Sequence, residues 1–539
     1  MTRKDLADAL AWLVLSAVVL SLIPIGYVSA DGIGQSLAFA AGFQRWNPNH
    51  LLVEPLGAGW LGLLIPGFSR AEGVDHLKRL CILAGALAIG LFRFGVAGRL
   101  ASSRLAANHG TAWIAASSAF SRLWISDEIH MVQMPAVVLV AVLALRYLDR
   151  PTLWRAALVG ASVTLAAAFF LENLLLGPAL AVGVLLRKRR SHAAAILGAT
   201  LMTTALVFGG IWAVSGSARG PLDWMTRYAG GTQPARVESA YGVEPSLAGL
   251  AESALRAGYG AACALVDLGS AVAAFRDGLP VGPVVPSLLA FAASLALLTG
   301  FRDRDTRLLV GVWATAVLVF GVFWNNSEDQ FYVQLSVAFG ALAARMPLRP
   351  ALLVLSLCAL LWNVADLTQR RILYPREERL ALMRTLDGAG LIVYPGFDEI
   401  EILYQLEPPK ARSVSFTSLA VQYPAQEGLL VLTEDIDRTL ASGRHVVLLD
   451  LFDTPRDRSP WKFLRRLGYE HDEVLEVLGQ YPAETRRLGP FTLRWVIKYH
   501  VSHGLLRKSQ GQPSLSETES TYPRAGKVTG DATILSGVV

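Results

Sequence analysis

Several acidic residues and one histidine stand beside hydrophobic segments, where their side chains could do chemistry. Asp31 directly follows the first hydrophobic span, and His50 begins an apolar helix in the same connecting stretch. Asp127 and Glu128 are flanked by aromatic, imidazole and apolar side chains, and Glu172 lies in the middle of a long apolar stretch. Carboxylates in such surroundings have perturbed proton affinities, so these residues are candidates for a functional site at a membrane face.

The composition determines the kind of elements that must position these residues. The chain has 539 residues, of which 53% are hydrophobic and only 17% charged, as in a polytopic membrane protein. Cys81, Cys263 and Cys358 lie in or beside apolar segments, and their spacing predicts neither a disulfide framework nor a zinc site. The net charge of +6 comes largely from short loops between spans, so nucleic-acid binding is not expected.

Runs of roughly 20 apolar residues predict membrane-spanning helices. The first is expected to be a retained helix and not a cleaved signal peptide, because no clear small-residue cleavage site follows it. About eleven spans are expected in total, two of them between Arg155 and Arg187. The other nine lie near 10–28, 79–97, 108–124, 131–146, 193–214, 282–300, 307–324, 331–345 and 349–366.

The stretch between Arg155 and Arg187 allows two interpretations. A single helix would be roughly 50 Å long and would bury Glu172 at a cost of about 3 kcal/mol. Two short helices meeting at Leu171–Asn173 keep the carboxylate at the surface and return the basic sequence RKRR to the side from which the chain came. The hairpin is therefore expected.

The loop charges then predict the orientation. Lys and Arg gather in every second loop, whereas the alternate short loops ISDEIH, LEN and NNSEDQ contain none. By the positive-inside rule the N-terminus is cytoplasmic and the acidic loops face outward, in a multi-pass protein of the cell inner membrane. Glu328 and Asp329 then share the outer face with Asp31, Glu128 and Glu172, so a helical bundle could bring several of these carboxylates together.

Two longer outer segments, 29–78 and 215–281, contain apolar runs interrupted by Gly, Pro or charge. We expect helices that lie along the membrane surface or enter it only partly. An even number of additional spans within 215–281 remains open.

The composition changes after residue 366. Segments GLIVYPG, ARSVSF, HVVLLDLF and FTLRWVI resemble buried strands, and the stretches DEIEILYQL, IDRTLASG and WKFLRRLGY between them resemble helices. The expected fold is therefore an all-α polytopic membrane domain, 1–366, followed by a small extracytoplasmic α/β domain, 367–500, with a short, mostly parallel sheet. Residues 501–539 have the composition of a disordered tail.

The outer segments also resemble a known family. An Asp after the first span, the sequence NPNHLLVEPLG that ends the first outer loop, and the acidic residues in WISDEIHMVQMP are similar to the GT-C membrane glycosyltransferases, which include protein mannosyltransferases and an aminoarabinose transferase. The start of a later span, NNSEDQFY, is similar as well. The resemblance is best over residues 10–210, and Gly32 stands where several members have a second acidic residue.

This resemblance implies an inverting enzyme that transfers a hexose or pentose from a polyprenyl-phosphate donor to a glycan, lipid or protein acceptor. Asp31 would be the general base, with Glu128 and Asp127 as further catalytic candidates. The donor phosphate and the sugar would be bound by residues of the same outer face: Arg45, Asn49, His50, Lys78, Arg79 and Glu172. A divalent metal ion such as Mg or Mn, held by Asp31, Glu128 and His50, is an alternative arrangement.

Simpler interpretations stay open for each residue. His50 could cap a helix, Glu172 could be the polar tip of a hairpin, and Arg45, Lys78 and Arg79 could anchor lipid headgroups. For the whole chain, the alternatives are a transporter or flippase of lipid-linked glycans and a catalytically inactive membrane scaffold. Transporters usually place polar residues near the middle of the membrane in related halves, a pattern that this sequence does not display.

Overall fold

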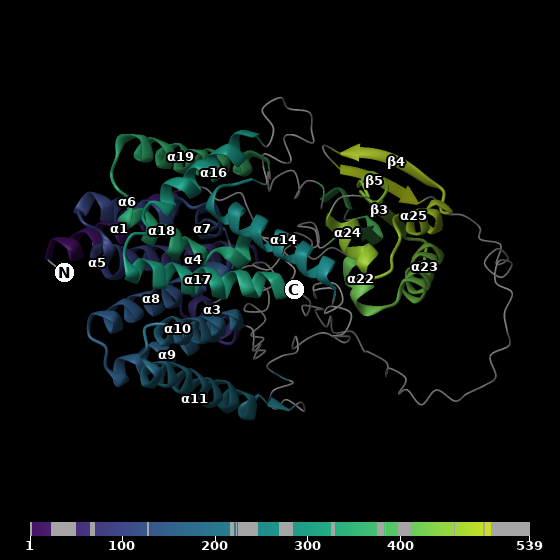
Figure 1. The fold of residues 1–539 in the computed structure, drawn as a ribbon. Coiled ribbons are helices and arrows are strands. Elements are labelled where there is room, and N and C mark those ends of the chain that lie inside the picture. The colour runs from purple at the N-terminus through teal and green to yellow at the C-terminus, as the bar shows by residue number, and fades with distance from the viewer. Residues whose placement is uncertain are drawn as a thin grey trace. The chain divides into compact units, whose positions relative to one another are not determined.

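The computed structural model divides the chain into two compact units (Figure 1). The helical unit comprises Met1–Met383 with Asp398–Pro408, and the C-terminal unit comprises Arg384–Phe397 with Pro409–Val539. The structure describes residues 3–22, 50–64, 70–126, 129–215, 246–268, 284–324, 329–373, 388–396, 411–456, 459–488 and 491–496, together with 220, 221, 224, 382 and 384–386. The predicted tail and the predicted helix DEIEILYQL lie outside these residues.

The helical unit consists of helices joined mostly by short turns, several of them 3-10 helices. In chain order they are α1 (Arg3–Leu22), α3 (Val53–Leu64), α4 (Arg70–Leu91), α5 (Gly98–Leu100), α6 (Arg104–Ala116), α7 (Ser118–Trp124), η3 (Ile129–Gln133), α8 (Met134–Asp149), α9 (Leu153–Phe169), η4 (Leu171–Leu175), α10 (Leu176–Leu185), α11 (Arg190–Val214), α14 (Leu247–Leu265), α16 (Val284–Leu298), α17 (Arg304–Trp324), η5 (Asp329–Tyr332), α18 (Leu335–Arg345) and α19 (Pro350–Leu373). A π-helical segment, η2 (Phe92–Ala97), connects α4 to α5.

Every stretch predicted as a span overlaps one or more of these helices. Four helical segments of the described residues are long and apolar enough to cross a membrane: His76–Leu100, Ile129–Asp149, Arg190–Val214 and Arg304–Phe323. Large apolar side chains on α11 are exposed, including Leu201 (70%) and Leu206 (68%), as expected for a surface that faces lipid. The helical unit is therefore that of an integral membrane protein, and the number of crossings stays a prediction.

The chain reverses at Leu171–Asn173, as the hairpin interpretation predicts. On α9, Gly160 approaches Ile196 and Thr164 hydrogen-bonds to Thr204, so α9 runs parallel to α11. The helix α10 ends at Leu185, a short turn before α11 begins at Arg190, and therefore runs antiparallel to α11. The alternative of one long helix is wrong, because α9 ends at Phe169 and Phe170 is extended.

The helix α14 lies within 215–281, the second of the two longer segments predicted to be outer. Its buried face is made of small side chains such as Ser253, Ala257 and Gly260, which allow close packing on α17 and η5. The Asn363 side chain of α19 binds the end of α14, donating to the Leu265 carbonyl (2.9 Å) and accepting from the Asp267 N–H (3.2 Å). The same amide donates to the Ala116 carbonyl at the break between α6 and α7 (2.8 Å). The C-terminal end of α14 is thus held among the helices.

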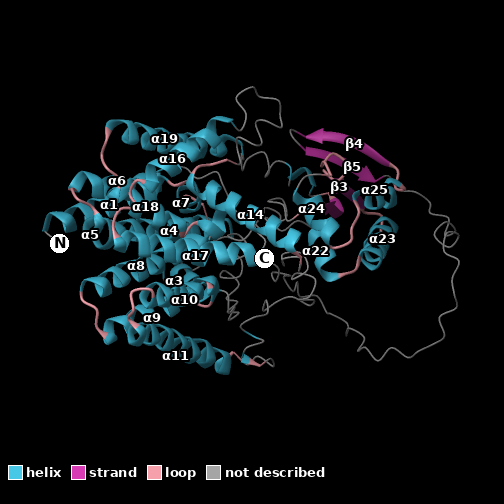
Figure 2. Ribbon diagram, in the orientation of Figure 1, coloured by secondary structure: helices cyan, strands magenta, loops and turns pink. Residues whose placement is uncertain are grey.

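The C-terminal unit contains a mixed sheet with the strand order β2-β1-β3-β5-β4, of which Figure 2 labels β3, β4 and β5. The strands are β1 (Ala389–Tyr394), β2 (Arg412–Ser415), β3 (His445–Leu449), β4 (Ala483–Leu488) and β5 (Phe491–Val496), with helices α22 (Phe416–Gln422), α23 (Ala425–Ala441), α24 (Ser459–Arg466) and α25 (His471–Gly479). The strand β1 pairs in parallel with β2 and β3, whereas β5 pairs antiparallel with β3 and β4.

The expectation of a mostly parallel sheet is therefore wrong. Sequence analysis predicts β1, β2, β3 and β5 but misses β4, whose sequence AETRRL has no apolar alternation. The side chains of β4 are largely exposed because it is an edge strand, and charged side chains are common there. The missed strand supplies one of the two antiparallel pairings.

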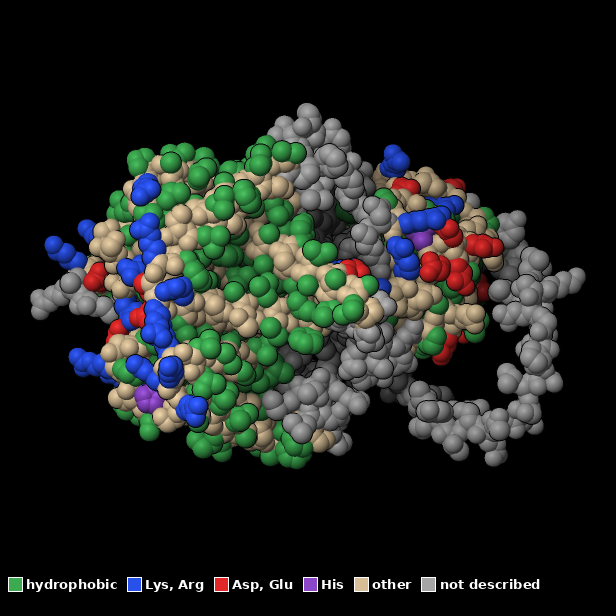
Figure 3. Space-filling view, viewed as in Figure 1, with side chains coloured by type: hydrophobic (Ala, Val, Ile, Leu, Met, Phe, Trp, Pro, Cys, Tyr) green, Lys and Arg blue, Asp and Glu red, His purple; other side chains and the backbone are tan. Residues whose placement is uncertain are grey.

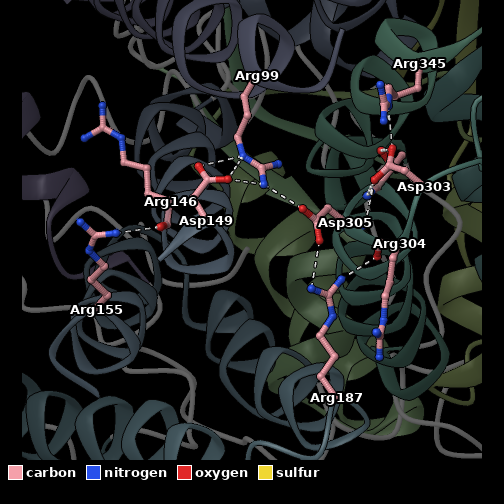
Figure 4. A network of polar contacts seen from close by, with 10 residues as sticks. Arg99, Arg146, Asp149, Arg155, Arg187, Asp303, Arg304, Asp305 and Arg345 are labelled. Atoms are coloured by element: carbon pink, nitrogen blue, oxygen red, sulfur yellow. Dashed lines mark hydrogen bonds and ion pairs between the residues drawn. The ribbon is translucent and has the colours of Figure 1, made fainter. Parts of the chain in front are cut away.

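Basic side chains form a band beside the apolar surface of the helical unit (Figure 3). Contacts between loops confirm that several of the predicted basic loops meet at this end, which we call the basic end. Arg99 binds Asp149 (2.6 Å) and Asp305 (2.8 Å), and Arg187 also binds Asp305 (2.9 Å), as Figure 4 shows. Nearby, Arg345 binds Asp303 (2.6 Å). That this end is cytoplasmic stays a prediction.

Candidate functional site

Four of the predicted site residues belong to the described part of the chain: His50, Lys78, Arg79 and Glu172. The other five lie outside it, namely Asp31, Arg45, Asn49, Asp127 and Glu128. The candidate site therefore consists of the four described residues and the side chains that surround them.

The segment that carries His50 is fixed to the backbone just before η4. The Leu52 N–H donates to the Ala168 carbonyl (2.7 Å), and His50 makes a hydrogen bond with the backbone of Phe169. The His50 ring packs edge-on against Phe170, with centroids 4.4 Å apart. Its hydrogen bond thus runs to the α9–η4 turn and not to the start of α3, which does not favour the capping interpretation.

The electrostatic setting of His50 favours a neutral ring. Burial lowers the pKa of His50 to about 4, although the backbone hydrogen bond with Phe169 acts in the opposite direction. The Nδ1 atom is buried and has no hydrogen-bond partner. A buried polar atom without a partner is costly, so this nitrogen is available for a bound molecule.

A second histidine, His130 of η3, shares this environment. Its ring lies 4.2 Å from Phe170 and 5.0 Å from Phe331 between centroids, and only 3% of the residue is exposed. The Nδ1 atom of His130 is also buried without a partner. Two imidazoles from distant segments therefore flank one phenylalanine. Sequence analysis assigned no role to His130, although it closely follows the acidic pair in WISDEIHMVQMP.

Glu172 lies within a network of side-chain amides. Gln334 Nε2 donates to Glu172 Oε1 (3.2 Å) and is also 3.3 Å from Gln133 Oε1. Asn173 Nδ2 donates to Gln133 Oε1 (2.6 Å) and to the Ala166 carbonyl (3.1 Å). The carboxylate is thus partly buried and oriented by groups from other segments, unlike a solvated hairpin tip. Amides inside predicted spans gave no separate sequence signal.

Lys78 and Arg79 are neighbours on α4 but point to different environments. Lys78 is 2% exposed, whereas Arg79 is exposed and lies 3.4 Å from the His76 ring nitrogen Nδ1. Trp60 of α3 donates to the His76 carbonyl (2.9 Å), which joins α3 to this part of α4. Headgroup anchoring fits the exposure of Arg79 but not the burial of Lys78.

His50 is one of the three residues predicted to hold a metal ion. Of the predicted ligands Asp31, Glu128 and His50, only His50 is described, and its unbonded Nδ1 would suit a metal ion. Within the described ranges no group of three or more His, Cys, Asp and Glu side chains is arranged to hold a metal ion.

Four segments that are distant in sequence meet around Phe170 and Glu172. They are the segment before α3, η3, the α9–η4 turn with η4, and the η5–α18 turn. Three of them belong to or directly adjoin loops predicted to share one face, and the fourth lies within 29–78, the first of the two longer segments predicted to be outer. We call this region, defined by His50, His130, Phe170, Glu172 and Gln334, the site end.

Comparison with known proteins finds matches among solved structures but none in sequence. No family model matches this sequence, and no curated protein resembles it significantly in sequence. Among solved structures, ArnT from Cupriavidus metallidurans bound to undecaprenyl phosphate is 14% identical with a TM-score of 0.48, covering 90% of this chain and 97% of that one. The apo state of that protein is 12% identical with a TM-score of 0.40, covering 91% and 98%.

An oligosaccharyltransferase from Archaeoglobus fulgidus, tethered to an acceptor peptide, is 11% identical with a TM-score of 0.43, covering 88% of this chain and 72% of that one. The chain is thus weakly similar in structure to ArnT and to an oligosaccharyltransferase. All three TM-scores lie below 0.5, so its function is inferred from its own residues.

Proposed function

We propose that the protein is an integral-membrane glycosyltransferase that transfers a sugar from a polyprenyl-phosphate donor to an acceptor at the outer membrane face. The observation that carries the proposal is the meeting of predicted outer segments at the site end, around His50 and Glu172. The sequence resemblance assigns a catalytic role to the same segments. Asp127 and Glu128 directly precede η3, whose His130 and Gln133 belong to this region.

The proposed reaction is a single displacement with inversion at the anomeric carbon. Asp31 accepts the proton of an acceptor hydroxyl while the hydroxyl oxygen bonds to the anomeric carbon of the donor sugar. The bond from that carbon to the phosphate oxygen breaks at the same time. The electron pair leaves with the lipid phosphate. Asp127 and Glu128 are further candidates for the same proton transfer, and Glu172 accepts a hydrogen bond from a sugar hydroxyl.

The leaving phosphate needs cationic or donor groups. Lys78 supplies a buried positive charge on α4, whereas the neutral His50 ring, bound through its other nitrogen to the Phe169 backbone, leaves Nδ1 as an acceptor for a sugar hydroxyl. Arg45, Asn49 and Arg79 are further candidates in the same outer segment. A bound Mg or Mn ion would add Lewis-acid stabilisation of the same phosphate oxygens.

The test is the D31N variant in cells whose outer-surface glycans are profiled. We expect a glycan to be lost or shortened while the protein is made and inserted normally. The matched control is D453N, which removes one exposed carboxylate in the C-terminal unit and is expected to leave the glycans unchanged. Unchanged glycans in D31N would contradict the enzymatic proposal, and a defect confined to translocation of the lipid-linked sugar would favour a flippase.

A further inference from the structure

A second charged region lies at the basic end, on the helices that carry the RKRR turn. It consists of six basic residues, which we call the basic cluster: Arg146, Arg150, Arg155, Lys188, Arg189 and Arg190. They belong to the last turn of α8, the first turn of α9 and the turn between α10 and α11.

Direct contacts join these turns. The Arg155 guanidinium donates to the carbonyls of Arg146 (3.3 Å) and Arg150 (3.2 Å). The Tyr147 hydroxyl lies 2.9 Å from the Nδ1 atom of His192, which brings the end of α8 to the start of α11. Because α9 and α11 run parallel, their first turns are also neighbours.

The cluster differs from Arg99, Arg187 and Arg345 at this end in its lack of counter-ions. Arg99 and Arg187 bind Asp149 and Asp305, and Arg345 binds Asp303. The six residues of the cluster make no ion pair within the described part of the chain. In Figure 4 the Arg146 guanidinium points away from the carboxylates, and one buried nitrogen of Arg189, Nη1, has no hydrogen-bond partner. We therefore expect an external anion to bind to this excess positive charge.

The surroundings of the cluster indicate what carries that anion. Large apolar side chains next to it are exposed: Trp154 (62%), Leu185 (48%) and Leu186 (77%). The Arg155 guanidinium carbon lies 5.4 Å from the Trp154 ring centroid. Exposed Trp and Leu beside unpaired Lys and Arg suit a molecule with acyl chains and a negatively charged headgroup.

We propose that the basic cluster binds the phosphate-bearing headgroup of an anionic phospholipid, with its acyl chains against Leu185, Leu186 and Trp154. Guanidinium groups match phosphate oxygens in geometry and charge, and the five arginines of the cluster lie on these adjoining turns. This site is at the end of the helical unit opposite the site end, because α9 begins at one and ends at the other, and it does not depend on the proposed reaction.

Lipid binding to the full-length protein tests the proposal. Native mass spectrometry of the purified protein would compare phosphatidylglycerol with phosphatidylcholine, and we expect preferential binding of phosphatidylglycerol. In K188Q/R189Q/R190Q we expect its affinity to fall at least about tenfold. The control R302Q/R349Q removes exposed charges near α16 and α19, away from α9 and α11 (Figure 1), and should change the affinity less than about twofold.

Three results would overturn the proposal. They are equal binding of both lipids, an equal loss in the control variant, and displacement of the lipid by inorganic phosphate, which would indicate a site for a free anion. If the triple variant does not fold, R146Q/R150Q gives the same test, because both residues are exposed.

Discussion

The two ends of the helical unit satisfy their buried polar groups in different ways. At the basic end, Asp305 binds both Arg99 and Arg187, and Asp303 binds Arg345. At the site end, the polar groups are imidazoles and amides, and the Nδ1 atoms of His50 and His130 are buried without partners. Unsatisfied buried groups destabilise a fold and are retained mainly where they serve function. We therefore assign a stabilising role to these ion pairs and a binding role to the two imidazoles.

The largest effect that would test this comparison is on activity at the site end. In E172Q we expect the transfer rate to fall by about one to two orders of magnitude, because the proposed hydrogen bond between a sugar hydroxyl and the Glu172 carboxyl group is weakened. The melting temperature should change little, since the amide can still bond to Gln334. The measurement is sugar transfer from a polyprenyl-phosphate donor by the purified protein. Wild-type rates in E172Q would remove Glu172 from the site.

A second test uses the pH dependence of stability, because His50 at the site end and Asp303 at the basic end titrate in different pH ranges. His50 has a folded-state pKa of about 4 against 6.5 in the unfolded chain, so the unfolded state binds more protons between these values. Its stabilising contribution, up to about 3 kcal/mol, is complete above pH 6.5 and is lost as the pH falls toward 4. Thermal unfolding of wild type and H50Q between pH 7 and 4 measures it, and wild type should lose more stability than H50Q as the pH falls.

The basic end should respond in a different pH range. Burial opposes ionisation of Asp303, but hydrogen bonds from Thr306 and Arg345 outweigh it and lower its pKa to about 2 from 3.8. Its contribution is complete above pH 3.8 and is lost as the pH falls toward 2. D303N should therefore be less stable than wild type at pH 5 and equally stable near pH 2. A constant difference across this range would contradict the assignment.

A smaller effect on stability is expected for D305N. The substitution removes the carboxylate shared by Arg99 and Arg187 and should lower the free energy of unfolding by about 2 kcal/mol, because both guanidinium groups lose a partner. The transfer rate of the folded fraction should stay at the wild-type value. Thermal unfolding in detergent and the transfer assay measure the two effects, and a lower rate at full folding would link the basic end to catalysis.

The smallest effect concerns two neighbours on α4. Lys78 is buried and Arg79 is exposed, so K78M should raise the KM for the lipid donor at least about tenfold, and R79Q should change it less than about twofold. Elution volume and melting temperature would show whether each variant folds. Equal effects of the two substitutions would contradict the separate roles inferred from burial.

Much of the helical unit could be predicted because the bilayer imposes simple requirements. Apolar length predicts helices, and loop charge predicts which loops lie together, as the contacts of Arg99, Arg187 and Arg345 confirm. The reversal at Glu172 could also be predicted, since a long buried helix would place a carboxylate in lipid. The strand β4 could not, because a charged edge strand has no apolar pattern.

The sequence by itself determined that this is a polytopic membrane protein with a mixed helix and strand domain at its C-terminus, and it predicted that the acidic loops share one face. Only the tertiary structure brought His130 against Phe170 and joined Gln334 to Glu172. The physical reason is that hydrophobic burial and loop charge act locally and leave a signal in every segment. Contacts between amides and aromatic rings of distant segments depend on how the helices pack, and no single segment records that packing.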